Sequence, residues 1–341
     1  MYRLSRLASL LALSLCVVAG LSAADAKAQT PQIPMADRVR LAEAFRLNDQ
    51  LSDKVWPGWG KTPFAVLLLT NDVEFLLRHP QPPGDFTAAG SDALLKTKVY
   101  YRKRTFPPSL LATLFVGGLP TVAIGQAENT NVRTSTRWVV TLMHEHFHQL
   151  QYSQPDYQEG TKALNLARGD QNGMWMLNYP FPYKSEEVNR AYAAMCERLA
   201  AALDDKSATP FGERLAAYLD ARRRFREAVS EDDYKYFAFQ LWQEGLARYT
   251  EYRVAALATS RYKPTPAFRT LKDFTPFSEV AAKTLARIKD EVNKPALSEH
   301  EREVVYGFGA AEALVLDRAN RRWQRRYFAE KFQTASYFSD K

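Results

Sequence analysis

The chain has 341 residues, and 46 lysines and arginines against 38 aspartates and glutamates give it a formal net charge of +8. A chain of this length can bury a sizeable core and hold one large domain or two modest ones. It contains no internal repeat and no low-complexity tract, which excludes repeat architectures and disordered tails as its main content.

The first 28 residues have the pattern of an export signal. Arg3 and Arg6 precede an apolar run from Leu7 to Leu21, and Ala26-Lys27-Ala28 has the small-x-small form of a cleavage site. We therefore predict a signal peptide over residues 1–28, a mature chain that begins at Gln29, and a periplasmic or secreted location of bacterial type. The apolar run is too short for a membrane span, and no later stretch approaches about 20 apolar residues.

Charge and cysteine content restrict what the mature chain binds. Arg3, Arg6 and Lys27 against Asp25 give the signal segment +2, which leaves +6. The arginine clusters near 222–226 and 318–326 lie in helical stretches of mixed charge, so we read them as solvated helix faces and expect no nucleic-acid partner. Cys196 is the only cysteine left after cleavage, so we expect no internal disulfide and a buried thiol.

The N-terminal part is expected to be mostly sheet. A helix is predicted from Met35 to about Trp56, followed by two strands within Phe64–Leu77 around a tight turn at 70–72. Further strands are predicted at 96–104, 114–117 and 121–125, with a loop at 80–84.

The remainder is expected to be helical. Apolar periodicity predicts helices near 157–168, 184–205, 210–229, 231–258, 277–293, 298–319 and 322–333. No linker separates the two parts. We therefore predict one α+β domain over 29–341, with the sheet in 29–155 and a helical lobe in 156–341.

Three of the five histidines fall in one short segment, TLMHEHFHQLQ, where His144, Glu145 and His148 spell H-E-x-x-H. On a helix, residues i and i+4 lie on one face, so His144 and His148 can bind one Zn²⁺ through their imidazoles. Such a metal lowers the pKa of a water towards about 7, and Glu145 is placed to take the proton from it. His146 points to another face and is expected to be a structural histidine or one that supports the metal ligands from behind.

The flanks of this motif are apolar and helical, and the hydroxyls of Thr134, Ser135 and Thr136 are candidates for the N-cap. A catalytic zinc site usually has a third protein ligand. The best candidate is Glu244, which lies 96 residues after His148 in the helical segment FQLWQEGLARYTEY. Glu251, Glu159 and Glu128 are the alternatives, and Glu244 could instead form an ordinary i,i+4 pair with Arg248.

A helix with H-E-x-x-H followed by a distant E-G-x-A resembles the gluzincin metallopeptidases, and residues 244–247 read EGLA. The resemblance implies a zincin-like fold, one zinc per chain on His144, His148 and Glu244, and Glu145 as general base. One departure is Arg248, which stands where the thermolysin-like branch has an aspartate that orients a histidine. The partners of the two zinc histidines are therefore left open.

The stretch VVYGFGAAEALVLDR is similar to the Y-x-x-G helix of the alanyl and glycyl aminopeptidase branches. This implies that Tyr306 donates a hydrogen bond to the oxyanion, with Gly309 at the glycine position; a core tyrosine beside glycines is the plain alternative, and His300 is a rival electrophile. Gly125–Asn129 is faintly similar to the amine-binding strand of aminopeptidases, but for Glu128 we favour a solvated strand end.

We therefore expect an exported zinc metallopeptidase that acts on a peptide or protein substrate. The alternatives are a zinc hydrolase of a non-peptide amide, such as a cell-wall component, and a non-catalytic binding protein that keeps the fold. The sequence does not choose between endopeptidase and aminopeptidase, and it predicts no oligomeric state.

Overall fold

The structure is a computed structural model that describes residues 30–339. The predicted signal peptide, residues 1–28, lies outside the described residues. Backbone contacts divide the chain into two units, Met1–Pro31 and Gln32–Lys341, and every helix and strand below belongs to the second.

One mixed sheet is built from the N-terminal part of this unit. Its strands are β1 (Val66–Leu69), β2 (Val73–Leu77), β3 (Thr87–Asp92), β4 (Thr97–Lys103), β5 (Leu111–Val116) and β6 (Leu119–Gly125). The spatial order is β3-β4-β2-β1-β6-β5, and only the β1–β6 pair is parallel. β5 is therefore an edge strand, with one side free of pairing within this sheet.

Helices make up most of the rest. The longer ones are α1 (Met35–Val55), α2 (Ser135–Tyr152), α5 (Glu186–Leu203), α6 (Phe211–Glu227), α7 (Glu231–Gln240), α8 (Leu246–Arg261), α10 (Phe277–Asn293) and α12 (Val304–Ala319). Short ones are α3 (Tyr157–Ala163), α4 (Trp175–Asn178), α9 (Pro266–Arg269), α11 (Leu297–His300) and α13 (Gln324–Tyr327). The unit is therefore α+β, as predicted.

Most of the predicted elements are confirmed, but several differ. The strand predicted at 114–117 is β5, which begins at Leu111, and the short helices α4 and α9 were not predicted. β3 was missed because its sequence, TAAGSD, has no apolar alternation and its residues are largely exposed. The predicted helix 298–319 is broken at Glu301, whose φ of 47° is incompatible with a continuing right-handed helix. The helices predicted at 157–168 and 322–333 are shorter, ending at Ala163 and spanning only Gln324–Tyr327.

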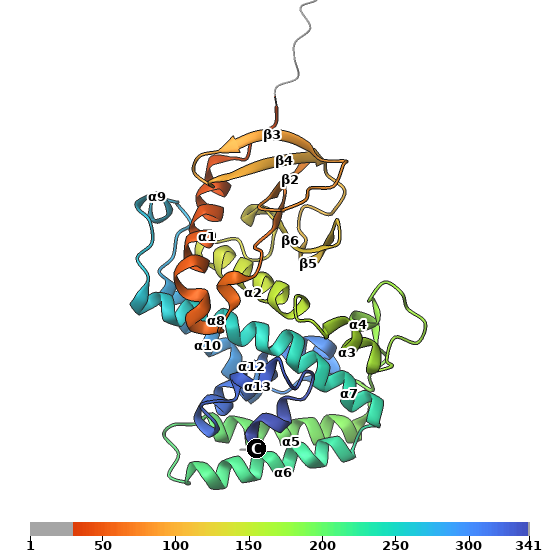
Figure 1. The fold of residues 1–341 in the computed structure, drawn as a ribbon. Coiled ribbons are helices and arrows are strands. Elements are labelled where there is room, and N and C mark those ends of the chain that lie inside the picture. The colour runs from red at the N-terminus through yellow and green to blue at the C-terminus, as the bar shows by residue number, and fades with distance from the viewer. Residues whose placement is uncertain (1–29, 340–341) are drawn as a thin grey trace, which may run out of the picture. The chain divides into compact units, whose positions relative to one another are not determined.

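Helix α2 lies between the sheet and the helical part. It contacts β5 and β6 on one side and α8 on the other, and Figure 1 shows the α5–α6 pair beyond α8 at the far end from the sheet. Trp138, Val139, Leu142 and Phe147 are fully buried along α2, which explains why so apolar a helix is stable there. Because α2 is covered by the sheet on one side and by α8 on the other, its histidine motif lies in the interior.

Two further expectations concern composition. Cys196 is buried and free, as predicted, and burial raises the pKa of its thiol to about 12. Among residues 30–339, no helix has the length and apolar character needed to cross a membrane.

Candidate metal centre

The two motif histidines are presented by one face of α2. Their imidazole centroids lie 5.0 Å apart, and both residues are buried. The helix begins as expected after Thr134, but the predicted hydroxyl cap is wrong: the Thr134 side chain accepts no hydrogen bond from the first turn. Thr136 instead donates to the carbonyl of Thr275, and Ser135 donates to Asp273.

Glu244 comes from the opposite side, on a π-helical turn, Leu241–Gly245, that joins α7 to α8 (η3). Its Oε2 lies 3.4 Å from Nε2 of His148 and 3.9 Å from Nε2 of His144. Ligands at about 2.0–2.2 Å from a tetrahedral ion lie about 3.3–3.6 Å from one another. The three donor atoms therefore have nearly the spacing of one face of a tetrahedral site.

The π-helical turn is part of this geometry. Single π turns inside α-helices insert one extra residue and occur often at functional sites. Here the turn includes Glu244 itself, and the predicted continuous helix 231–258 is confirmed with that one irregularity. The alternative in which Glu244 pairs with Arg248 is not what the structure has, because Arg248 pairs with Glu251.

Glu145 forms a second carboxylate neighbour of the histidines. His144, Glu145 and His148 are all buried, and their nearest ligand atoms lie within 4.8 Å of one another, so this group could hold a metal ion. For the third ligand we favour Glu244 over Glu145, because Thr113 of β5 holds Glu145: its hydroxyl lies 2.9 Å from Oε2 and 2.8 Å from the backbone carbonyl of Glu145.

The electrostatics favour a cation between these side chains. Burial lowers the pKa of His148, but the carboxylates of Glu244 and Glu145 outweigh it and raise that pKa to about 9. Burial raises the pKa of Glu244, but His148, His144 and Arg302 outweigh burial and lower that pKa to about 2. A negative carboxylate facing two imidazole nitrogens is the donor set that zinc binds in proteins.

Each motif histidine has a partner for its other nitrogen. Glu251 Oε2 lies 3.5 Å from Nδ1 of His144 and 2.7 Å from Arg248, while Gln151 Oε1 lies 2.6 Å from Nδ1 of His148. A proton held on Nδ1 leaves the Nε2 lone pair free for a metal. Glu251 lies between His144 and Arg248 and is the carboxylate next to Nδ1 of His144.

Gln151 also connects the two halves of the site. Its amide donates to the backbone carbonyls of Trp242 and Gln243, both at 3.0 Å, in the π-helical turn that includes Glu244. The Tyr327 hydroxyl accepts a hydrogen bond from the same Gln151 amide and donates one to the backbone carbonyl of Trp242. One buried side chain therefore fixes the orientation of His148 and the position of the turn with Glu244.

The glycines of the two downstream motifs touch. A Cβ on Gly245 would lie 2.6 Å from Cα of Gly309, and a Cβ on Gly309 would lie 2.6 Å from Cα of Gly245. This contact lets α12 approach the π-helical turn and brings Tyr306 beside the histidines, with its ring centroid 6.3 Å from that of His144. Burial and Glu244 raise the pKa of Tyr306 well above its usual value, so the phenol remains a hydrogen-bond donor.

Arg302 is a site residue that the sequence did not suggest. Its Nη1 lies 3.8 Å from Glu244 Oε1 and 3.4 Å from the Tyr306 hydroxyl. It follows directly on Glu301, whose positive φ re-aims the chain between α11 and α12. The only signal in the sequence was its position four residues before Tyr306 on a predicted helix.

The other candidates lie elsewhere. His146 packs on Phe64 with ring centroids 3.8 Å apart, and both its nitrogens meet side-chain amides, of Gln149 and Asn48, as expected of a structural histidine. Glu128 is not a free strand end, because it follows β6 in a 3-10 turn and bonds Arg40 through both oxygens. Glu159 and His300 are exposed, and within residues 30–339 neither forms a hydrogen bond or an ion pair with the motif residues.

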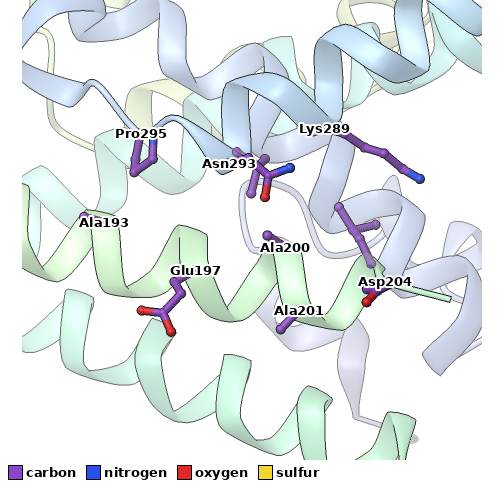
Figure 2. Close-up of a pocket in the computed structure, with 10 residues that line it drawn as sticks. Ala193, Glu197, Ala200, Ala201, Asp204, Lys289, Asn293 and Pro295 are labelled. Atoms are coloured by element: carbon purple, nitrogen blue, oxygen red, sulfur yellow. The ribbon is translucent and has the colours of Figure 1, made fainter. Parts of the chain in front are cut away.

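One hollow elsewhere on the molecule, of about 520 Å³, lies between α5 and the end of α10 (Figure 2). Its lining is mixed, with three alanines, three other apolar or amide side chains beside Leu203, and three charged residues. Its charged residues are Glu197, Asp204 and Lys289, and Glu197 and Lys289 extend in different directions in Figure 2. No histidine or cysteine lines it.

Comparisons with protein-family models, with curated proteins and with solved structures found no match to this chain. Function is therefore argued from the side chains. The side chains of His144, Glu145 and His148 could hold a metal ion, and the carboxylate of Glu244 lies close to both histidines.

Proposed function

We propose that the chain is a zinc-dependent metallopeptidase of the gluzincin type, with a zincin-like arrangement of sheet and active-site helix. The observation that supports this most is the approach of Glu244 to both motif histidines, 3.4 Å and 3.9 Å between donor atoms, from 96 residues away in the chain. A chance H-E-x-x-H motif would not be expected to meet a partly buried carboxylate from a distant helix.

His144, His148 and Glu244 would hold one zinc. When bound, zinc supplies Lewis-acid polarisation and makes water acidic near neutral pH. Glu145 lies one residue from a ligand, and the Thr113 hydroxyl orients its carboxylate, so it would accept the proton from the attacking water and pass it to the leaving amine.

Tyr306 would stabilise the oxygen that gains negative charge. Its hydroxyl is neutral, half-enclosed and next to the guanidinium of Arg302, which draws electron density from the phenol. A neutral donor and an adjacent cation aimed at the same region lower the energy of a developing oxyanion. The glycine contact between α12 and the π-helical turn sets the distance of Tyr306 from the ligands.

A peptide is the substrate that the surrounding backbone fits best. β5 is an edge strand, contacts α2, and carries Thr113 against Glu145. An extended peptide paired with its free edge would run past the general base. An aminopeptidase needs a free carboxylate to bind the amine of its substrate. At the candidate position Glu128 accepts hydrogen bonds from Arg40 instead, so we favour an endopeptidase. Export to the periplasm or medium remains a prediction from residues 1–28.

The test is cleavage of a mixed peptide library followed by mass spectrometry. The zinc-loaded protein should cleave internal bonds, a chelator should stop cleavage, and added zinc should restore it. Glu145→Gln should lower the rate by about 10²–10⁴-fold while the protein keeps its metal. Unchanged cleavage by Glu145→Gln would contradict the assignment of the base. Hydrolysis of a cell-wall amide without cleavage of any peptide would replace the substrate class.

A further inference from the structure

A second pocket, of about 430 Å³, lies where the start of α2 meets α8 and α10. Five of its lining residues are cations: Arg133, Arg137, Arg248, Lys283 and Arg287. Only two are anions, Glu251 and Glu279. None of His144, His148 and Glu244 lines this pocket, and Glu251, which does, lies 3.5 Å from Nδ1 of His144.

The positive charge of this pocket is only partly paired. Lys283 bonds Glu279, Arg287 bonds Glu291, and Arg248 bonds Glu251 through Nη1. Nε of Arg248 is nevertheless buried without a hydrogen-bond partner. Within residues 30–339, no hydrogen bond or salt bridge involves the guanidinium of Arg137 or Arg133.

Arg137 is the cation whose position most needs a counter-charge. Its side chain is half-buried at the pocket wall. Burial lowers its pKa, and Arg287 and Arg248 lower it further, against the attraction of Glu251. A half-buried guanidinium without a bonded partner is unfavourable, and an anion in the pocket would remove that penalty.

The start of α2 adds a second, independent contribution. Thr134 occupies the N-cap position but accepts no hydrogen bond, and the Thr136 hydroxyl is engaged by Thr275, so the first amides of this 18-residue helix have no side-chain cap. Uncapped amides and the helix dipole favour a negative group at this end. Thr134 and Arg137 both line the pocket.

We propose that this pocket is a binding site for a phosphate group, carried by inorganic phosphate or by a phosphomonoester. Guanidinium groups bind tetrahedral oxyanions through paired N–H donors, and the guanidinium groups of Arg137 and Arg133 offer donors that no protein acceptor within residues 30–339 uses. A small monovalent anion such as chloride would use only part of this donor set. The proposal does not depend on zinc or on peptide cleavage.

The test is calorimetric titration of the full chain, after chelator treatment so that metal cannot take the phosphate. Inorganic phosphate and glycerol phosphate are titrated separately, at an ionic strength fixed with chloride. We expect saturable binding that weakens as salt is added. Binding of both ligands would assign the pocket to phosphomonoesters as well, and binding of inorganic phosphate alone would assign it to the free ion.

Arg137→Gln should weaken phosphate binding by about tenfold or more. Without phosphate it should melt at the same temperature as the wild type or higher, because an unpaired cation has been removed. Arg322→Gln, in the exposed arginine cluster near the C-terminus, is the matched control and should bind like the wild type. If Arg137→Gln does not fold, exposed Arg133→Gln replaces it, with a smaller loss expected.

Two results would overturn the proposal. One is no binding of phosphate beyond the effect of chloride at equal ionic strength. The other is equal phosphate affinity in the wild type and in Arg137→Gln, or a loss seen in Arg322→Gln instead, which would move the binding to the C-terminal arginines.

Discussion

Two faces of α2 hold histidines under opposite conditions. His144 and His148 point their Nε2 atoms at Glu244, whereas His146, between them in sequence, stacks on Phe64 and has both nitrogens beside amides. The pKa of His148 is raised to about 9 because carboxylates outweigh burial, and the pKa of His146 is lowered to about 3 by burial. The face with His144 and His148 therefore favours a positive charge, and the face with His146 disfavours one.

The difference shows what makes a histidine a candidate ligand. All three side chains are buried on the same helix, so burial does not distinguish them. What distinguishes them is whether a protein group already satisfies the second nitrogen. Nδ1 is anchored in His144 and His148 while Nε2 faces a carboxylate, and in His146 no nitrogen is left over.

The largest expected effect comes from acid on the His146 face. The pKa of His146 in the folded protein, about 3, lies below the 6.5 of an exposed histidine, so its contribution to stability is complete above pH 6.5 and is lost as the pH falls towards 3. The free energy of unfolding should fall by about 1.4 kcal/mol per pH unit in this window. Urea unfolding of chelator-treated protein, measured across pH, checks this.

The control for that prediction is a pair of variants. His146→Gln should have a shallower dependence on pH, by about one proton. His300→Gln, at an exposed histidine, should keep the dependence of the wild type. Identical slopes in His146→Gln and wild type would mean that His146 is not held neutral.

A smaller effect is expected on the metal-facing side, at the glycine contact. In Gly245→Ala the new Cβ would lie 2.6 Å from Cα of Gly309, so α12 must move and the free energy of unfolding should fall by about 1–3 kcal/mol. Gly212→Ala in α6 meets nothing within 4 Å and should be neutral or stabilising by up to about 1 kcal/mol. Denaturant midpoints compare the two. Equal stability of both variants would mean that the helices are not in contact there.

The smallest expected effect concerns Glu251, the carboxylate next to Nδ1 of His144. Glu251→Gln keeps the size of the side chain but removes the charge next to His144 and Arg248. Zinc affinity should fall by about 10–100-fold with little change in fold. Competition with a chromophoric chelator measures it, and Glu159→Gln, at an exposed glutamate, should leave affinity unchanged. Unaltered affinity in Glu251→Gln would remove this residue from the site.

Much of the site was predictable because its residues follow local patterns. The motifs H-E-x-x-H and E-G-x-A pointed to His144, His148 and Glu244. Apolar periodicity predicted the two helical segments that carry them. Whether Glu244 binds zinc stays a prediction. Glu251 was considered only as a rival ligand, since the sequence gives no sign that two helices would bring it to His144.

Other features depended on backbone details that side-chain pattern does not encode. Thr113 and Gln151 lack any motif of their own, and their roles follow from strand order and from the depth of α2 in the core. Arg302 is brought to the site by the left-handed backbone of Glu301, a conformation that glutamate rarely adopts. The uncapped start of α2 also went against its threonine-rich sequence.

The measurement that tests the central claim most directly is zinc titration of chelator-treated protein by calorimetry, with the two faces of α2 compared. About one zinc per chain should bind to the wild type and to His146→Gln. His148→Ala and Glu244→Ala should each lose most of that binding. Full binding in both of these variants, or no binding in the wild type, would contradict the account.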